Sequence, residues 1–473
     1  MISNPTRRTF LLGAGATGLV SMLPIQAVLA NPDKRLRLSA KPTTLDLLNG
    51  AGPKTDVWAY GGSVPGPEIR LRQGELLHVT FENGLTQGST VHWHGIRLPN
   101  EMDGVPGLTQ KPVLPGETFE YTFRPPDAGT YWYHPHVKSS EQVGRGLYGP
   151  LIIEERDPPK VDRDVTWVID DWRLTENGEI DDSFSAMRDM SHSGRLGNVA
   201  TLNGVDSEKF SVRAGERIRL RLINVANARG FALNFSGHQP VVIALDGQPV
   251  TPYSPPLGRV VLGSGQRADL IIDMGGAPEQ VFSVDDDFYA RQPYKFLDLV
   301  YQKLPPLREA LLTTKIQLPA NPLPKLVLEQ AKIMDVRVSG GAMGRMRSAR
   351  FRGEEMNIRD LVGHGKVWSI NGEVFDPNSG SPLFTLAKGS TQRMRFSNDT
   401  SWPHPMHLHG HTFKIETRDG VKPEREIWTD TVLLAPGEQV ETLFVADNPG
   451  DWLLHCHILE HHEAGMAAVV RIA

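Results

Sequence analysis

One short pattern occurs three times along the chain and restricts the folds that are open to it. Each copy is a glycine turn leading into an alternating strand that ends at asparagine, at residues 74–83, 214–224 and 388–398. A further turn follows each copy, around Gly116, Gly265 or Gly437. Internal repeats indicate domains of one type, and alternation indicates strands with one buried face. With 46 glycines and 36 prolines marking frequent turns, the chain predicts an all-β protein of three related β-sandwich units.

We expect the first unit to span residues 31–156, the second 157–303 and the third 330–473. Residues 304–329 are rich in proline and predict a linker, which leads into a flexible Gly/Arg/Met-rich stretch that ends near residue 356. The second unit carries none of the histidine clusters described below. The sequence therefore predicts that it is a spacer between two functional outer units.

Residues 1–30 resemble a twin-arginine-type signal peptide. Arg7 and Arg8 precede a short apolar run that ends at Ala30, which predicts export by the twin-arginine machinery to the periplasm. Three glycines and Pro24 interrupt the run, so a stable membrane anchor is not expected. The net charge of -5 gives no reason to expect a nucleic-acid partner. The single cysteine excludes an intrachain disulfide.

The histidines are concentrated in four short stretches. Of 16 histidines, 12 lie in or beside His92-Trp-His94, His134-Pro-His136, His404-Pro-Met-His407-Leu-His409 and the run from His455 to His462. On a strand, residues two apart point to the same face, so each His-x-His motif presents two imidazoles together. Imidazoles combined with a thiolate favour copper, zinc or iron as the metal.

The last stretch points to copper. One thiolate, two imidazoles and a weak axial thioether form a blue-copper site. Cys456, His461 and Met466 supply three of these groups, and a distant histidine must supply the fourth. If the chain is extended here, the sulfur of Cys456 points one way and the rings of His455 and His457 point the other. The sequence therefore predicts two adjacent copper centres joined by a short covalent path.

Taken together, the four stretches resemble the four copper-binding motifs of the multicopper oxidases, which include laccases, ascorbate oxidases, bilirubin oxidases and bacterial cuprous oxidases. The resemblance extends from about residue 40 to the C-terminus, and all four motifs are present in order. It implies three cupredoxin-like Greek-key β-sandwich domains, with a trinuclear copper cluster between the first and the third. It also implies four coppers per chain, of which one is type 1, one is type 2 and two are type 3.

The resemblance assigns every copper ligand to a residue of this chain. The implied type 1 ligands are His404, Cys456, His461 and Met466. The implied type 2 ligands are His92 and His407. The implied type 3 ligands are His94, His134, His136, His409, His455 and His457. No ligand of the family pattern is missing.

Two acids resemble the family's proton-handling residues. Glu460 follows the last type 3 motif, and Asp103 follows the first motif; each could act as a general acid near bound oxygen. The alternatives are a surface helix position for Glu460 and an ordinary Asp-Gly turn for Asp103. We also expect Asp430 to support the type 1 region through hydrogen bonds, and His462 to have a supporting or solvent-facing role.

The resemblance implies that the chain couples one-electron oxidation of four donor equivalents to reduction of O₂ to water. Residues 400–402 read Thr-Ser-Trp where cuprous oxidases have Asp-Met-Met, and methionines between 334 and 356 are few. Since thioethers are the ligands that Cu(I) prefers, we favour a laccase-like oxidase of phenols or aromatic amines. The alternatives are a metallo-oxidase of Cu(I), Mn(II) or Fe(II), a non-catalytic periplasmic copper-binding or structural protein, and a two-domain copper nitrite reductase.

Overall fold

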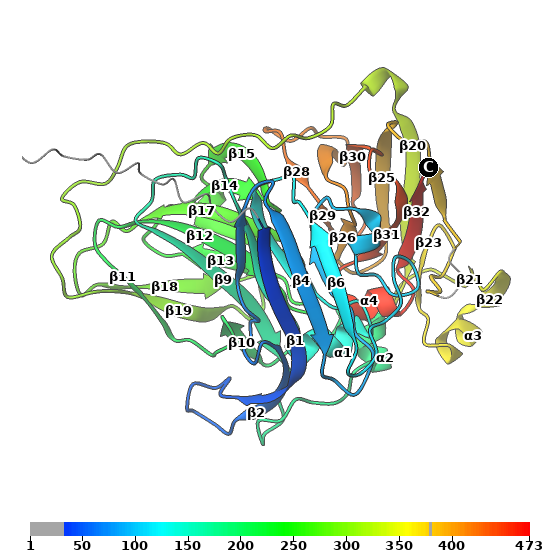
Figure 1. The fold of residues 1–473 in the computed structure, drawn as a ribbon, viewed down its shortest axis with the longest axis horizontal. Helices are drawn as coiled ribbons and strands as arrows, with labels where there is room; N and C mark the ends of the chain where they lie inside the picture. The colour runs from blue at the N-terminus through cyan, green and yellow to red at the C-terminus, as the bar shows by residue number, and fades with distance from the viewer. Residues whose placement is uncertain (1–32, 378–380) are drawn as a thin grey trace, which may run out of the picture. The chain divides into compact units, whose positions relative to one another are not determined.

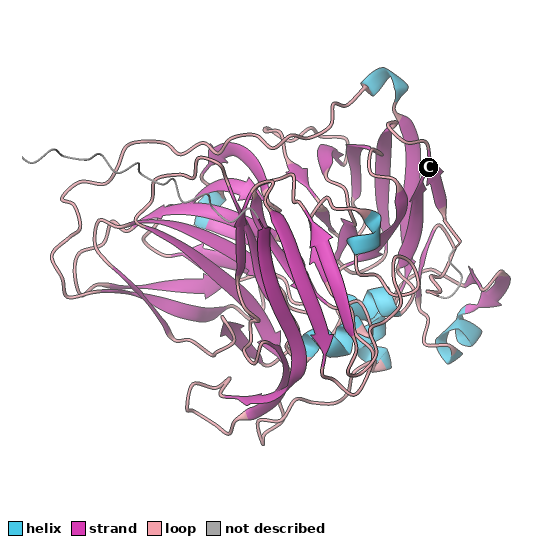
Figure 2. Ribbon diagram, in the orientation of Figure 1, coloured by secondary structure: helices cyan, strands magenta, loops and turns pink. Residues whose placement is uncertain are grey.

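The computed structural model describes residues 33–377 and 381–473, and the predicted signal segment lies outside them. Strands are the main regular secondary structure of the described chain, and the helices are short (Figures 1 and 2). The strands form three sandwiches of two sheets each, with a hydrophobic core in each sandwich. This confirms the predicted all-β class. Among the described residues, no helix has the length and apolar character needed to cross a membrane.

The first sandwich pairs a sheet of order β2-β1-β4-β6 with one of order β3-β8-β7-β5. Its strands are β1 (Asp33–Leu45), β2 (Thr55–Tyr60), β3 (Ile69–Arg72), β4 (Leu76–Asn83), β5 (His92–His94), β6 (Thr118–Phe123), β7 (Gly129–His134) and β8 (Gly149–Glu154). The short helices η1 (Asn100–Met102) and α1 (Ser139–Gly144) lie in its connections.

The second sandwich pairs a sheet of order β10-β9-β12-β17-β14-β15 with one of order β11-β19-β18-β13-β16. Its strands are β9 (Arg163–Trp172), β10 (Val199–Leu202), β11 (Lys209–Val212), β12 (Arg217–Asn224), β13 (Phe231–Phe235), β14 (Val241–Leu245), β15 (Gln248–Tyr253), β16 (Arg259–Leu262), β17 (Arg267–Asp273), β18 (Val281–Asp286) and β19 (Tyr294–Tyr301). It also contains α2 (Met187–Ser191) and η2 (Pro256–Gly258).

The third sandwich pairs a sheet of order β23-β20-β25-β30-β27-β28 with one of order β24-β32-β31-β26-β29. Its strands are β20 (Lys332–Gly340), β23 (Trp368–Ile370), β24 (Phe384–Leu386), β25 (Thr391–Asp399), β26 (His404–Leu408), β27 (Phe413–Arg418), β28 (Trp428–Thr429), β29 (Thr431–Leu434), β30 (Gln439–Val445), β31 (Gly450–Cys456) and β32 (Ala467–Ile472). The additional elements are η3 (Leu328–Gln330), the hairpin of β21 (Ser348–Phe351) and β22 (Glu354–Asn357), α3 (Ile358–Gly363) and α4 (Leu459–Glu463).

The repeated sequence pattern forms the same strand in each sandwich. β4, β12 and β25 lie parallel to β1, β9 and β20, the first strand of their own sandwich. The asparagine that ends each copy makes the same hydrogen bonds in all three sandwiches. Its side-chain oxygen accepts from the backbone N–H two residues later, and its side-chain NH₂ donates to two carbonyls. The three asparagines are Asn83, Asn224 and Asn398. Each closes the loop that leaves its strand, as short polar side chains do in turns.

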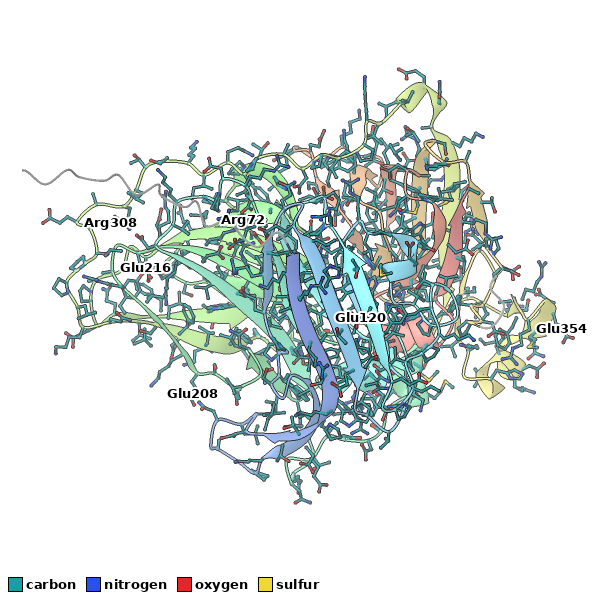
Figure 3. All side chains as sticks on the ribbon, viewed as in Figure 1. Arg72, Glu120, Glu208, Glu216, Arg308 and Glu354 are labelled. Carbon is teal, nitrogen blue, oxygen red and sulfur yellow. The ribbon has the colours of Figure 1, made fainter. Side chains whose placement is uncertain are left out.

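The predicted linker runs along the second sandwich without forming strands between residues 304 and 327. Arg308, labelled in Figure 3, binds both carboxylate oxygens of Asp162 at 2.7 Å. Arg217 donates to the carbonyls of Leu312 and Thr314. The bonds from Arg217 satisfy carbonyl groups of the segment that have no strand partner. Together with the Arg308–Asp162 pair, they hold the segment against the second sandwich.

Candidate metal centres

Two pairs of neighbouring antiparallel strands carry the histidine motifs. In the first sandwich, β5 pairs with β7 so that His92 lies opposite His134. In the third sandwich, β26 pairs with β31 so that His407 lies opposite His455. Since residues two apart share one face of a strand, each His-x-His motif turns both of its rings in one direction. The register between strands then brings two motifs together in each sandwich.

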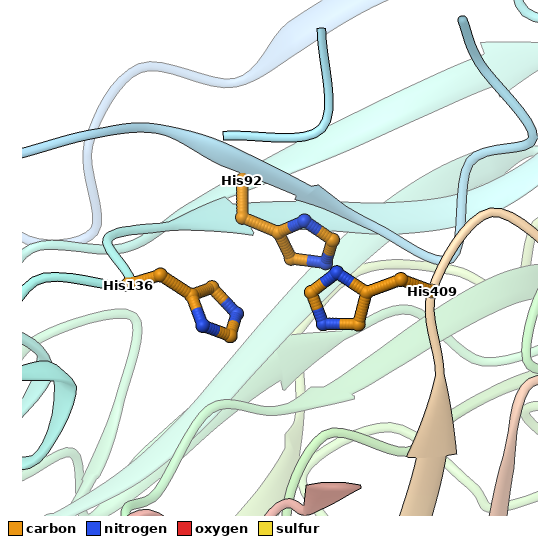
Figure 4. A group of neighbouring side chains, drawn as sticks. All are labelled: His92, His136 and His409. Carbon is orange, nitrogen blue, oxygen red and sulfur yellow. The ribbon is translucent and has the colours of Figure 1, made fainter. Parts of the chain in front are cut away.

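Eight histidines meet in one buried group between the first and third sandwiches, which we call the eight-histidine cluster. Its members are His92, His94, His134, His136, His407, His409, His455 and His457, each at most 6 % exposed. Figure 4 shows the rings of His92, His136 and His409 converging, and a nitrogen of each lies within 4.8 Å of the others. The structure thus brings together all the side chains that were predicted to bind type 2 and type 3 copper.

Most rings of the cluster have one nitrogen bound by the protein and the other left free. Nδ1 of His92 lies 2.8 Å from the carbonyl oxygen of Asp103, and Nδ1 of His407 lies 2.9 Å from that of Asp430. No hydrogen-bond partner among the described residues reaches Nε2 of His92, His134, His407 or His457, or Nδ1 of His94. Buried polar atoms without partners are costly, whereas a metal ligand has this arrangement: one nitrogen held, the other on the metal. The cluster therefore fits bound metal.

Burial also sets the protonation state of these rings. It lowers the pKa of His94, His134, His136, His407, His409, His455 and His457 below the ordinary histidine value, and neighbouring rings add to the effect at most of them. Neutral imidazole is the form that binds a metal ion. These seven rings are thus in the ligand form at neutral pH.

A second group, which we call the Cys456 site, lies in the third sandwich alone. The Cys456 sulfur is 3.6 Å from Nδ1 of His404 and 3.8 Å from Nδ1 of His461, and these two nitrogens are 3.2 Å apart. Met466 is fully buried in the same core. The other nitrogen of His461 bonds to the carbonyl oxygen of His192 at 2.7 Å, and that of His404 to the Thr400 hydroxyl at 2.8 Å. Both Nδ1 atoms are thereby free to bind a metal.

Strand alternation separates the two centres as the sequence predicted. Cys456 packs in the core of the third sandwich, while its neighbours His455 and His457 belong to the eight-histidine cluster. Burial raises the pKa of the Cys456 thiol, so a thiolate at this position requires a compensating cation. The residues present therefore fit one metal at Cys456 and a separate group of metals held by the residues directly before and after it.

Asp103 connects the first and third sandwiches at the cluster. Its carboxylate lies 2.8 Å from Nδ1 of His409 and 3.2 Å from Nδ1 of His92, and the side chain is fully buried. Ring nitrogens from two sandwiches thus meet at one residue, with His409 bonded to the carboxylate of Asp103 and His92 to its backbone carbonyl. That arrangement orients both rings and leaves their Nε2 atoms turned inward.

Glu460 lies in α4 and is 1 % exposed. Its carboxylate accepts from Asn227 Nδ2 at 2.9 Å and from the Arg195 N–H at 3.1 Å. Burial raises the pKa of Glu460 to about 7, so the side chain can hold a proton at neutral pH. The surface-helix alternative for Glu460 is therefore wrong.

His462 is closer to the cluster than the sequence indicated. Its ring centroid lies 4.7 Å from that of His455 and 5.6 Å from that of His136. With Glu463 and Lys366, it lines a cavity of about 430 Å³ that reaches His136. This cavity gives small molecules a route to the edge of the cluster.

Asp430 was expected to support the type 1 copper region, and this expectation was wrong. Asp430 Oδ1 lies 3.3 Å from His94 Nε2 and 3.3 Å from His407 Nδ1, so it supports the eight-histidine cluster and not the Cys456 site. The sequence motif around it could not show this, because the strand after Asp430 pairs with the His407 strand. The register of β26 with β29 decides which centre the carboxylate reaches.

Segments from two sandwiches cover the Cys456 site. The indole of Trp368 lies 4.4 Å from the His461 ring and 5.1 Å from the His404 ring, and its N–H donates to the Met190 carbonyl in α2. The Ala342 N–H donates to the Ser191 carbonyl at 2.7 Å. α2 of the second sandwich and the turn after β20 of the third sandwich therefore lie beside this site.

Comparison with known proteins gives one consistent family. Residues 43–158, 163–298 and 351–473 match sequence models described as multicopper oxidase. The multicopper oxidase MmcO of Mycobacterium tuberculosis is 31% identical over 91% of this chain and 85% of its own. Copper resistance protein A of Escherichia coli is 26% identical, with both chains covered in full. A crystal structure of a multi-copper oxidase from Pseudomonas thermotolerans has a TM-score of 0.80 and 34% identity, and covers 93% of this chain and 99% of that one.

Proposed function

The chain belongs to the multicopper oxidase family, and on that premise we propose that it oxidises phenols or aromatic amines at the Cys456 site and reduces O₂ at the eight-histidine cluster. The observation that carries the proposal is the set of inward, unpartnered ring nitrogens beside a separate thiol site. When bound, four coppers would supply one-electron oxidation at the first site and four-electron reduction of O₂ to water at the second. A copper carrier or structural protein has no need of two such centres.

The proposed ligands are those the family pattern implies. His404, Cys456, His461 and Met466 would hold type 1 copper, and His92 and His407 would hold type 2 copper. The remaining six histidines of the cluster would hold the type 3 pair. The Nε2 atoms of His409 and His455 are 3.1 Å apart. Because Nδ1 of each ring faces an oxygen acceptor, both Nε2 atoms of the neutral rings carry lone pairs, and this supports ligation.

Proton delivery is assigned to Glu460, with Asp103 holding the rings. Glu460 is buried one residue before the proposed ligand His461 and keeps a proton near neutral pH. Asp103 orients His92 and His409 through hydrogen bonds. The cavity beside His462 would admit O₂ and release water.

A metallo-oxidase of Cu(I) is the second candidate. The cover of the Cys456 site exposes two thioethers, Met187 at 40% and Met343 at 73%, and soft sulfur ligands suit Cu(I). The likeness to copper resistance protein A also favours it. Mn(II) or Fe(II) would find carboxylates more suitable, and the carboxylate of α2, Asp189, is buried and paired with Arg173.

Oxygen uptake by the copper-loaded protein decides between the two donors. We expect faster uptake with 2,6-dimethoxyphenol than with stabilised Cu(I), each offered separately. Faster uptake with Cu(I) would shift the function to copper detoxification. The variant Met187→Leu with Met343→Leu keeps the apolar cover, so it should slow only the Cu(I) reaction. Met356→Leu, on β22, is the matched control.

Export to the periplasm stays a prediction from the sequence, since it depends on Arg7 and Arg8, outside the described residues. Cell fractionation of the full chain would check it, and retention of the mature protein in the cytoplasm would contradict it.

A further inference from the structure

Three arginines are almost fully buried on the sheet of the second sandwich that contacts its neighbours. Arg219 and Arg221 lie on β12 and Arg267 lies on β17, and none is more than 1 % exposed. Arg219 and Arg221 pair with acids of the first two sandwiches. Arg267 differs, because its carboxylate partner comes from the third sandwich.

Arg267 joins all three sandwiches at one point. Its Nη1 and Nη2 donate to the two carboxylate oxygens of Asp430 at 2.9 and 2.6 Å, and its Nε donates to the carbonyl of Thr130 on β7 at 3.1 Å. A guanidinium that binds both oxygens fixes the plane of the carboxylate as well as its position. Arg267 of the second sandwich therefore holds the Asp430 carboxylate in one orientation.

Asp430 in turn faces two rings of the cluster. Its Oδ1 lies 3.3 Å from Nε2 of His94 and 3.3 Å from Nδ1 of His407, and these rings stack at 3.9 Å with 13° between their planes. His94 belongs to the first sandwich and His407 to the third. With these nitrogens turned to the carboxylate, Nδ1 of His94 and Nε2 of His407 are left without partners and point to the metal position.

Gly95 lies against the Arg267–Asp430 ion pair, which leaves no space for a side chain at this position. This residue follows His94 directly and has a φ of +86°. A Cβ atom there would lie 2.4 Å from Arg267 Nη2 and 2.5 Å from Asp430 Oδ2. Any other residue would push the guanidinium and the carboxylate apart, so the glycine of the first motif is required by a contact with the second sandwich.

A neighbouring loop of the second sandwich makes a similar contact. The Ser264 hydroxyl lies 3.1 Å from Nδ1 of His457, and a Cβ on Gly265 would lie 2.7 Å from that ring. The second sandwich thus reaches the cluster at two places, directly at His457 and through Asp430. It is not the passive spacer that the sequence predicted.

We propose that Arg267 is a positioning residue for the type 2 copper, which acts through Asp430 on His407 and His94. The proposal rests on the ligand assignment of the proposed function. A sandwich that binds no copper thereby sets the geometry of a site built by the other two. Outer contacts that orient metal-bound histidines change metal affinity by about 10–100-fold when they are lost.

The test compares Arg267→Lys with Arg221→Lys in the copper-loaded protein. Both variants exchange a buried guanidinium for an ammonium, and both parent arginines donate to Thr130, but only Arg267 binds Asp430. We expect Arg267→Lys to lose type 2 copper to a chelator about 10–100-fold more readily and to show an altered type 2 signal in electron paramagnetic resonance. The blue type 1 band should be unchanged, and Arg221→Lys should retain the type 2 signal.

An unchanged type 2 signal and chelator sensitivity in folded Arg267→Lys would overturn the proposal, as would equal losses in both variants. If Arg267→Lys does not fold, Asp430→Asn decides. The asparagine keeps the size of the side chain but not its charge or its second acceptor oxygen, and it should weaken the same signal; an intact signal would overturn the proposal. A wild-type protein that binds copper without any type 2 signal would instead contradict the proposed function.

Discussion

At the scale of single residues, the side of the strand that a residue occupies determines its chemistry. Cys456 and its two histidine neighbours are consecutive, yet the sulfur packs into the third sandwich and the rings face the first. α4 divides its residues in the same way: Glu460 turns to Asn227, whereas His462 turns to the cluster and its cavity. Glu460 and His462, which flank the proposed ligand His461 in the sequence, are therefore two candidates for proton transfer.

The variant Glu460→Gln tests which of them delivers protons. It preserves the hydrogen bond from Asn227 but cannot release a proton, so the reaction of the reduced enzyme with O₂ should slow about 100-fold or more, within the range of general acids. Bleaching of the blue band by the donor should keep its rate. Stopped-flow absorption follows both steps, with Glu463→Gln as the control. Full-speed reoxidation in Glu460→Gln together with slow reoxidation in His462→Asn would move the proton path to the cavity.

At the scale of elements, the contacts between sandwiches rely on buried polar groups. Tyr148, which precedes β8, donates at 2.6 Å to Asp170 on β9, and this joins the first sandwich to the second. Burial and the adjacent Asp171 carboxylate raise the pKa of Asp170 to about 8. Asp170 is therefore protonated in the folded protein at pH values where the unfolded chain has released that proton.

This difference predicts that the stability of the fold falls as pH rises. A carboxyl whose folded pKa is raised from 3.8 to about 8 stabilises the fold fully below pH 4, and this contribution is lost progressively towards pH 8. At about 1.4 kcal/mol per unit, the loss amounts to several kcal/mol. Asp170→Asn should remove this part of the slope in urea unfolding between pH 5 and 8. Parallel stability curves for wild type and variant would contradict the assignment.

At the scale of the whole molecule, the two centres are built differently. Every proposed ligand of the Cys456 site lies in the third sandwich, whereas the eight-histidine cluster takes four histidines from the first and four from the third. Metal in the cluster would therefore clamp two sandwiches together, because binding to the folded state alone adds to its stability. The Arg267–Asp430 pair and Asp103 reinforce the same junction.

Removal of all copper should consequently destabilise the protein far more than loss of the type 1 copper alone. Each bound copper adds about 4 kcal/mol when its free concentration is 1,000 times its Kd. We expect a large fall in Tm for the chelated wild type and a small one for copper-loaded Cys456→Ser, which should also lose its blue colour and donor oxidation. Calorimetry and visible absorption measure these effects. Equal falls in Tm, or turnover of phenols by Cys456→Ser, would refute this assignment.

The repeat, the fold class and the candidate ligands could be predicted from local sequence patterns. Alternation and turns depend on neighbouring residues, so the strands after Gly74, Gly215 and Gly389 could be predicted from local pattern alone. The motif histidines were recognisable because their spacing places two rings on one strand face. The resemblance to a family then supplied which ligand belongs to which copper.

The contacts that hold those ligands could not be predicted, because they join distant parts of the chain. Arg267 is 163 residues from Asp430, and Ser264 is 193 residues from His457; no local pattern marks either contact. Register between β26 and β29 placed Asp430 at the cluster and not at the Cys456 site, and the packing of α4 turned His462 inward. Such contacts depend on strand register and on the packing of the sandwiches. Both are set by the whole chain and not by the residues adjacent to each contact in sequence.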